Sequence, residues 1–189
     1  MSAITKYEIE FVERTKDLLN NNFSDFQNKD KEVTFLLNCL LGLIITVSEN
    51  EKRSNLTFKG KIDDTFLSNI PDKVGFIKKT RNNIELTDNQ STEIKTNVGH
   101  KTDLKDCTKL WFVNKLRNGI AHQNIEGIND NGKWIGLKLW NTNNDLKDFE
   151  IIFTIEELKN LALSIADEYI KSKKPKEKQR KPAHDKGLA

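Results

Sequence analysis

Hydrophobic residues recur at helical spacing along the first part of the chain. Within residues 5–21, Tyr7, Phe11 and Leu18 are separated by four and seven positions, and this stripe predicts an amphipathic helix. Residues 30–49 follow a different pattern. Their centre, TFLLNCLLGLIITV, is apolar on nearly every face, which predicts a helix enclosed by others. Asn38 inside it is then expected to find a buried partner or to line an interior site.

A third helix is expected to begin at Thr102 or Asp103 as N-cap and to continue to His122. From Leu110 to Ala121 its apolar residues fall on several faces. One neighbouring helix cannot cover them all, so this helix is expected to be central to the core or shared with a partner chain.

The period then changes from helix to strand. Asn129-Asp130-Asn131-Gly132 is a strong turn signal, and Lys133–Trp140 alternates so that Trp134 and Trp140 share one strand face. Phe149–Phe153 is a further β-prone run. These runs predict a small antiparallel sheet of two or three strands within residues 125–153.

The last helix has a clear beginning. Thr154 is followed three residues later by Glu157, which is the spacing of a capping box. The helix is expected to run to about Lys171, with four side chains turned inward: Leu158, Leu161, Ile165 and Tyr169.

Residues 50–101 are rich in Asn, Lys, Thr and Asp. They predict a short helix near residues 62–70 within an otherwise irregular insertion. The fold class expected is therefore mainly α: a helical bundle of residues 1–170 with a small antiparallel sheet before the last helix. Residues 171–189 are expected to form a basic disordered tail.

Charge is concentrated in that tail. It carries +6 of net charge, which leaves −3 for the remaining chain, since the total is +3. The basic pI is thus no evidence for a basic groove on the folded part. The tail either attaches loosely to nucleic acid or only keeps the terminus soluble, and the second interpretation is favoured.

Cys39 and Cys107 match no metal-ligand spacing, and there is no cysteine framework, so a reducing, cytoplasmic setting is expected. The start, MSAITKYEIE, does not resemble a secretory signal. The apolar run from Phe35 to Val47 is too short to span a bilayer, so no membrane association is expected.

The segment Arg117-Asn118-Gly119-Ile120-Ala121-His122 ends the apolar third helix. RNA can be cleaved without metal when its own 2′-hydroxyl attacks the adjacent phosphate. Such a site needs a proton acceptor or donor, and histidine can serve as either near neutral pH. It also needs a cation for the phosphoryl oxygens, and the guanidinium of arginine is permanently charged and can donate two hydrogen bonds to one phosphate. Asn118 lies four residues before His122, so its amide could orient the imidazole or contact the phosphate.

This segment resembles the Arg-polar-x-x-x-His motif of HEPN domains, helical bundles that include many RNA-cleaving toxins and defence effectors. FLLNCLLGLII (residues 35–45) and WIGLKLWN (residues 134–141) resemble a group of HEPN nucleases found on plasmids and mobile elements. The resemblance implies a metal-independent endoribonuclease acting on single-stranded RNA or tRNA and leaving 2′,3′-cyclic phosphate ends. Arg117, Asn118 and His122 would be its catalytic residues. It also implies no cofactor, no metal, a toxin or anti-phage role, and an antitoxin or regulatory partner.

Helix geometry places Arg117 and His122 about 140° apart on an ideal helix, because they are five residues apart. The family's arrangement, in which the motifs of two chains meet, would bring two of each residue into one cleft. A symmetric homodimer with a composite active site is therefore expected.

Two alternatives stay open. Arg and His near a helix C-terminus can simply satisfy the last carbonyl groups and the negative end of the dipole. The chain would then be a non-catalytic, dimeric HEPN module that binds RNA or regulates a partner. Weaker candidates for substrate contact are His100 in a polar stretch and the Trp134–Trp140 face, while His184 in the tail is expected to be inert.

Overall fold

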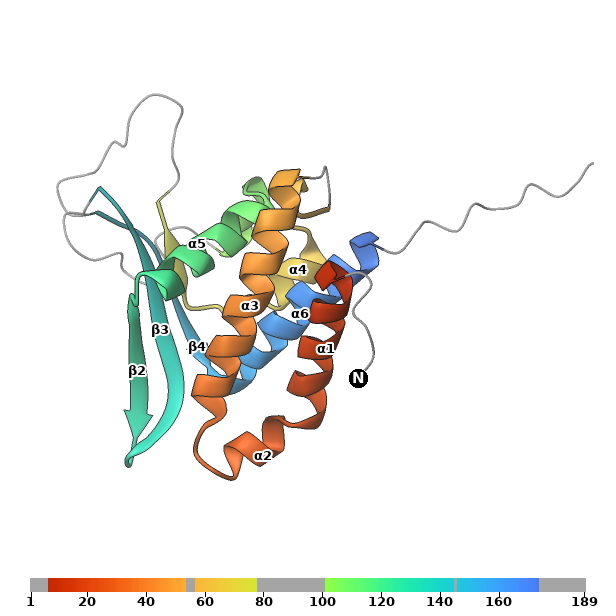
Figure 1. Cartoon of the computed structure of the whole chain (residues 1–189). Coiled ribbons are helices and arrows are strands. Elements are labelled where there is room, and N and C mark those ends of the chain that lie inside the picture. The colour runs from red at the N-terminus through yellow and green to blue at the C-terminus, as the bar shows by residue number, and fades with distance from the viewer. Residues whose placement is uncertain (1–6, 54–56, 78–100, 145, 174–189) are drawn as a thin grey trace, which may run out of the picture.

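In the computed structural model, which describes residues 7–53, 57–77, 101–144 and 146–173, helices pack on one face of an antiparallel sheet (Figure 1). The helices are α1 (Tyr7–Asn21), α2 (Phe23–Gln27), α3 (Glu32–Arg53), α4 (Asp64–Ser68), α5 (Lys109–Ala121) and α6 (Ile155–Lys173). Two 3-10 turns are η1 (Thr57–Lys59) and η2 (Lys101–Asp106). The strands are β1 (Val74–Phe76), β2 (Ile125–Asp130), β3 (Lys133–Asn143) and β4 (Leu146–Thr154).

Helix α3 is the centre of the helical layer. It contacts α1, α2, α5 and α6, and Leu36, Leu40 and Leu43 along it are wholly buried. The expected position of Asn38 was wrong, because its side chain is exposed. Asn38 lies seven residues from Ile45, which is 44% exposed, so both occupy a face of α3 that the other described helices leave uncovered.

Helix α3 also contains an 18-residue stretch, Glu32–Glu49, with a mean hydropathy of 1.6, so length and composition alone would allow it to cross a membrane. Half of that stretch is buried inside the fold, and its contacts with four other helices fit a core helix of a globular fold.

The sheet has the order β1-β4-β3-β2, and every pair is antiparallel. Two or three strands were expected within residues 125–153, and β2, β3 and β4 are those three. The inner face of β3 and β4 is closed by buried side chains that pack toward α5 and α6: Leu137, Leu139, Phe149, Ile151 and Phe153.

The expectation of irregular structure was wrong for residues 57–77. The short α4 helix is present as predicted, but β1 adds a fourth strand beside β4. Phe58, Phe66 and Phe76 are each at most 2% exposed. This segment therefore belongs to the core, and residues 54–56 and 78–100 of the expected insertion lie outside the described residues.

Helix α5 starts later than predicted. Residues 101–106 form the separate turn η2, and Thr108 rather than Thr102 or Asp103 is the N-cap. Its Oγ1 accepts a hydrogen bond from the backbone N–H of Trp111 at 3.1 Å. Thr108 is fixed by an antiparallel bridge to Lys61, a contact across 47 positions that no local pattern reveals.

The first residue of α5, Lys109, is a buried cation, 3% exposed. Its Nζ lies 2.6 Å from carboxylate oxygens of both Asp63 and Glu168. Burial lowers the pKa of Lys109, but its hydrogen bonds to the two carboxylates outweigh burial and leave the pKa raised. The hydrogen bond from Lys109 in turn lowers the pKa of Asp63. This triad fastens the start of α5 to α4 and α6.

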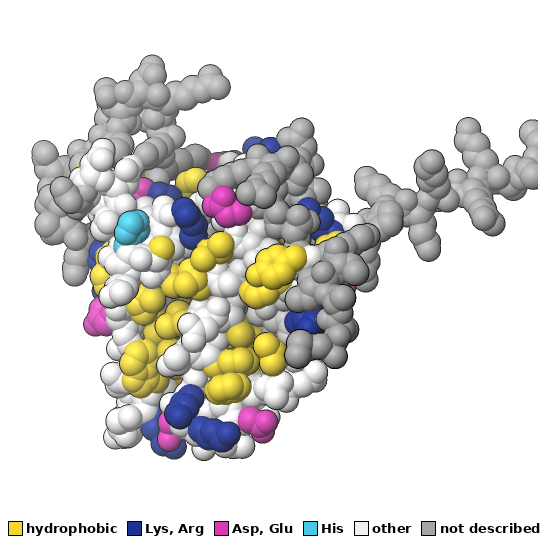
Figure 2. Space-filling view, in the orientation of Figure 1, with side chains coloured by type: hydrophobic (Ala, Val, Ile, Leu, Met, Phe, Trp, Pro, Cys, Tyr) yellow, Lys and Arg dark blue, Asp and Glu magenta, His cyan; other side chains and the backbone are white. Residues whose placement is uncertain are grey.

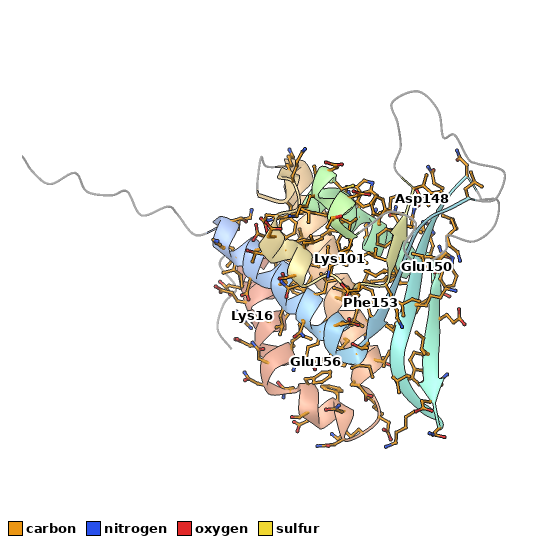
Figure 3. All side chains as sticks on the ribbon, turned by 180° about the vertical axis from the view of Figure 1, so that it is seen from behind. Lys16, Lys101, Asp148, Glu150, Phe153 and Glu156 are labelled. Atoms are coloured by element: carbon orange, nitrogen blue, oxygen red, sulfur yellow. The ribbon has the colours of Figure 1, made fainter. Side chains whose placement is uncertain are left out.

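The last helix begins as predicted. The backbone N–H of Thr154 donates to Glu157 Oε2 at 2.8 Å, and the N–H of Glu157 donates to Thr154 Oγ1 at 3.2 Å. Lys16 of α1 pairs with Asp167 of α6 at 2.5 Å, which ties the two helices together (Figure 3). The four side chains expected to face inward are buried. Helix α6 continues to Lys173, so the first residues of the expected tail are helical.

A β-bulge changes the direction of Trp134. The register of β2 and β3 shifts between Ile128 and Asn129, so β3 carries one extra residue there. Trp134 consequently packs over Gly127, on the side of the sheet opposite to that of Trp140. The prediction that the two tryptophans share a strand face was therefore wrong.

Candidate functional site

The motif helix α5 lies directly on β3, and Gly119 makes this possible. A Cβ at Gly119 would lie 2.6 Å from Leu139 Cδ2 and 2.7 Å from the carbonyl oxygen of Trp140. Ile120, the next residue, is 8% exposed and joins the core. The middle of the motif thus serves packing, which places the residues on either side of it at the surface.

The backbone closes the end of α5 without help from side chains. The N–H groups of His122, Gln123 and Asn124 donate to the carbonyl oxygens of Asn118, Ile120 and Gly119 at 3.0, 3.1 and 2.9 Å. This is a Schellman motif, with Gln123 in the left-handed conformation at φ 57°. Main-chain donors therefore satisfy three carbonyl groups in the last turn, those of Asn118, Gly119 and Ile120.

The three predicted site residues all lie at this end of α5. His122 is the C-cap and its side chain is exposed. Arg117 and Asn118 are half-buried, and Arg117 Nη1 lies 3.4 Å from Asn118 Oδ1, which is a long, weak hydrogen bond. Among the described residues Arg117 has no salt bridge, and no side-chain hydrogen bond joins Arg117 to His122.

A cavity of about 590 Å³ runs along α5 and reaches the motif at Asn118. Thr108, Trp111 and Asn114 line it from the same helix, at spacings that put them on one face with Asn118. The end of β1 and the start of β4 complete its walls. The cavity gives the motif a neighbouring space of mixed aromatic and polar character.

A buried ion pair lies in the wall of this cavity. Lys115 Nζ pairs with Asp148 Oδ2, and Asn141 Nδ2 donates to Asp148 Oδ1 at 2.5 Å. Asp148 and Glu150 lie two residues apart on β4 (Figure 3). Sequence reasoning did not single out Lys115 or Asp148. The only local signal was the position of Lys115, three residues before Asn118.

The remaining predictions about the site concern metals and other histidines. No group of three or more His, Cys, Asp or Glu side chains that could hold a metal ion occurs in the part of the chain that the structure describes. His100 and His184 lie outside that part. Trp140 is half-buried, with Lys147 Nζ 5.3 Å from its ring centroid.

A helical core in which α5, packed between α3 and the sheet, ends in an Arg-Asn-x-x-x-His segment fits the HEPN class, whose domains are commonly ribonucleases and commonly act as dimers on RNA. The chain belongs to the family described as HEPN pEK499 p136, which matches residues 1–176. The expected membership of a plasmid-type HEPN family is thereby confirmed. No curated protein and no solved structure matches the chain.

Proposed function

We propose that this protein is a metal-independent endoribonuclease that cleaves single-stranded RNA or tRNA, with Arg117, Asn118 and His122 as its catalytic residues. One observation carries the proposal: main-chain N–H groups already satisfy the carbonyl groups of Asn118, Gly119 and Ile120 in the last turn of α5. The capping role that would explain an Arg and a His here is filled by the backbone. An exposed imidazole and a guanidinium without a salt bridge among the described residues are left for a substrate.

In this reaction the 2′-oxygen of a ribose attacks the adjacent phosphorus and the bond from phosphorus to the 5′-oxygen breaks. The products are a 2′,3′-cyclic phosphate and a 5′-hydroxyl. His122 accepts the proton of the 2′-hydroxyl, and a second His122 donates a proton to the leaving oxygen. Arg117 stabilises the charge that develops on the phosphoryl oxygens, and Asn118 orients the imidazole or contacts the phosphate.

A symmetric homodimer supplies the second histidine, since Arg117 and His122 project about 140° apart from one helix. Hydrophobic side chains gather over α1 and α3 on the face seen in Figure 2. Tyr7, Leu18 and Ile45 are 61%, 46% and 44% exposed, and α3 packs beside α5. Burial of this face against a second copy would bring two motif helices together.

The test of catalysis is cleavage of a mixed single-stranded RNA and total tRNA in EDTA, with the 3′ ends mapped. Wild type should leave cyclic phosphates, while His122→Ala and Arg117→Ala should each lose about 10²–10⁴-fold in rate. Asn129→Ala, an exposed change on the neighbouring strand, is the matched control and should cleave normally. Full activity of His122→Ala with an intact fold would refute the proposal. If no protein cleaves RNA, wild type included, the result would favour a binding module.

The composite site has its own test. Inactive Arg117→Ala chains are mixed with inactive His122→Ala chains under conditions that exchange subunits. A mixed dimer holds one intact arginine and one intact histidine on different chains, so if the site spans the interface it should regain the part of the rate that one Arg117 and one His122 supply, but not the part that needs the second His122. A site contained within one chain would stay inactive in every mixture.

We propose further that the protein is a toxin or anti-phage effector that acts in the cytoplasm and is restrained by an antitoxin or regulatory partner; membership of a plasmid-type HEPN family is compatible with the effector role. Induced expression of wild type should then arrest bacterial growth, while expression of His122→Ala should not. Equal growth in the two cultures would count against the toxin role but not against the ribonuclease activity.

A further inference from the structure

A second cavity, of about 500 Å³, opens between the N-terminal end of α3 and the tip of the β2–β3 hairpin. These two segments lie side by side at the foot of the molecule in Figure 1. None of the three motif residues lines it. Its walls combine carboxylates, a lysine, aliphatic side chains and an indole, and it shares no lining residue with the cavity beside α5.

The floor of this cavity contains a carboxylate that lacks a partner. Glu32 is 8% exposed, and its Oε2 is the one buried side-chain nitrogen or oxygen among the described residues without a hydrogen bond. Glu32 is the first residue of α3, where the helix dipole favours a negative charge. Asp30 lines the cavity as well, and so does Lys133, which forms no salt bridge with Glu32 among the described residues. Since no described residue donates to this oxygen, a donor brought by a ligand would remove the cost of leaving it unpaired.

An indole stands at the mouth of the same cavity. The bulge in β3 brings both Trp134 and Ile135 to it, and they are 45% and 49% exposed. The ring of Trp134 is held against Gly127, where a Cβ would lie 2.9 Å from the ring. The side chains of Val33 and Leu37 on α3 form an apolar part of the cavity wall. An aromatic face, an unpaired carboxylate and an aliphatic wall together suit a planar cation on an alkyl arm.

We infer that this cavity receives an arginine side chain of a partner polypeptide. The guanidinium donates to Glu32 Oε2 and stacks on Trp134, while its alkyl arm packs on Val33 and Leu37. A polypeptide is favoured over a free amine because Trp134 and Ile135 leave apolar surface exposed beyond the cavity, which residues flanking the arginine would cover. This site is independent of the proposed ribonuclease activity.

The experiment uses the full-length protein and three probes: acetyl-Leu-Arg-Leu-amide, the same peptide with citrulline, and agmatine. Citrulline replaces the guanidinium with a neutral urea of nearly the same shape. Binding is followed by the NMR shift of the Trp134 indole N–H, which is assigned by its absence in Trp134→Phe. The arginine peptide should bind saturably with a millimolar Kd, and the citrulline peptide at least about tenfold more weakly.

Variants show whether Glu32 is the acceptor. Glu32→Gln should weaken the arginine peptide at least about tenfold, while Asp17→Asn, a change of an exposed acid on α1, should not alter binding. If Glu32→Gln does not fold, Trp134→Leu is titrated instead, followed by backbone N–H shifts of β2, and the same weakening is expected. Equal binding of the two peptides, no loss in these variants, or no saturable shift would overturn the inference. Agmatine binding as tightly as the arginine peptide would overturn the assignment to a polypeptide.

Discussion

Gly119 offers the sharpest test of how the motif helix is held. In Gly119→Ala the new methyl carbon would stand 2.6 Å from Leu139 Cδ2 and 2.7 Å from the carbonyl oxygen of Trp140. The Leu139 side chain can turn aside, but the carbonyl belongs to β3 and can move only with the strand. Helix α5 must therefore shift away from the sheet.

The expected change in the free energy of unfolding follows from two opposing contributions. Overpacking of this kind costs about 1–3 kcal/mol, while alanine gains up to about 1 kcal/mol over glycine in a helix. Since one of the two clashes is with a backbone atom, the cost should lie in the upper half of its range, at about 2–3 kcal/mol, and the net expectation is a loss of about 1–2 kcal/mol in the free energy of unfolding. For a chain of this size the melting temperature should fall by about 2–8 °C.

Guanidinium denaturation and thermal melting followed by circular dichroism measure this change. The matched control is Gly42→Ala in α3, where a Cβ would meet only the ring edge of Phe11 at 2.9 Å. That half-buried ring can tilt, so the control should be neutral or gain up to about 1 kcal/mol from helix propensity. If Gly119→Ala is as stable as wild type, α5 is not seated on β3 as described.

Three further predictions concern stability and reactivity. Gln123→Gly should raise the free energy of unfolding by about 0.5–1 kcal/mol, because Gln123 is held at φ 57° and glycine accepts that conformation; no gain in guanidinium denaturation would contradict the Schellman closure. Lys109→Met should cost about 1–3 kcal/mol, because it leaves the largely buried Glu168 without its cation while the more exposed Asp63 stays solvated, whereas Lys105→Met, which breaks an exposed pair, should cost less than about 1 kcal/mol. The lowered pKa of Asp63 means that its contribution is complete above its ordinary pKa and is lost as the pH falls through the lowered value, so Lys109→Met should show a weaker loss of stability in acid than wild type. Burial raises the pKa of the Cys39 thiol to about 11, so it should resist iodoacetamide near neutral pH until the protein is unfolded; rapid labelling of the native protein would show that Cys39 is not buried.

Sequence patterns predicted an element correctly where the interactions that form it join residues close together in the chain. The stripe of α1 and the capping box of α6 depend on residues within a few positions of one another. Helix α1 ends at Asn21 and helix α6 begins directly after Thr154, both as predicted. The start of α5 was misplaced because its cap, Thr108, is fixed by Lys61. Strand β1 was missed for the same reason, since its partner β4 lies more than 70 positions further along the chain.

The candidate site likewise has features that the sequence alone reveals and features that depend on the folded sheet. The Arg-Asn-x-x-x-His spacing could be found from sequence alone, and the three residues lie where a helix C-terminus was expected. The closeness of Gly119 to β3 and the ion pair between Lys115 and Asp148 could not be found, because each joins segments that meet only after the sheet forms. The bulge that redirects Trp134 depends on the register of β2 with β3, so strict alternation gave the wrong face.

The pairing of β1 with β4 also determines the order in which the chain can fold during synthesis. Strand β4 is the neighbour of both β1 and β3, yet it begins only at Leu146. A nascent chain that ends before this residue carries the complete motif helix but lacks the strand that joins β1 to the rest of the sheet. Because such distant contacts form late and slowly, the motif is translated well before its supporting sheet exists. The sheet that supports this end of α5 therefore cannot close until β4 has been synthesised.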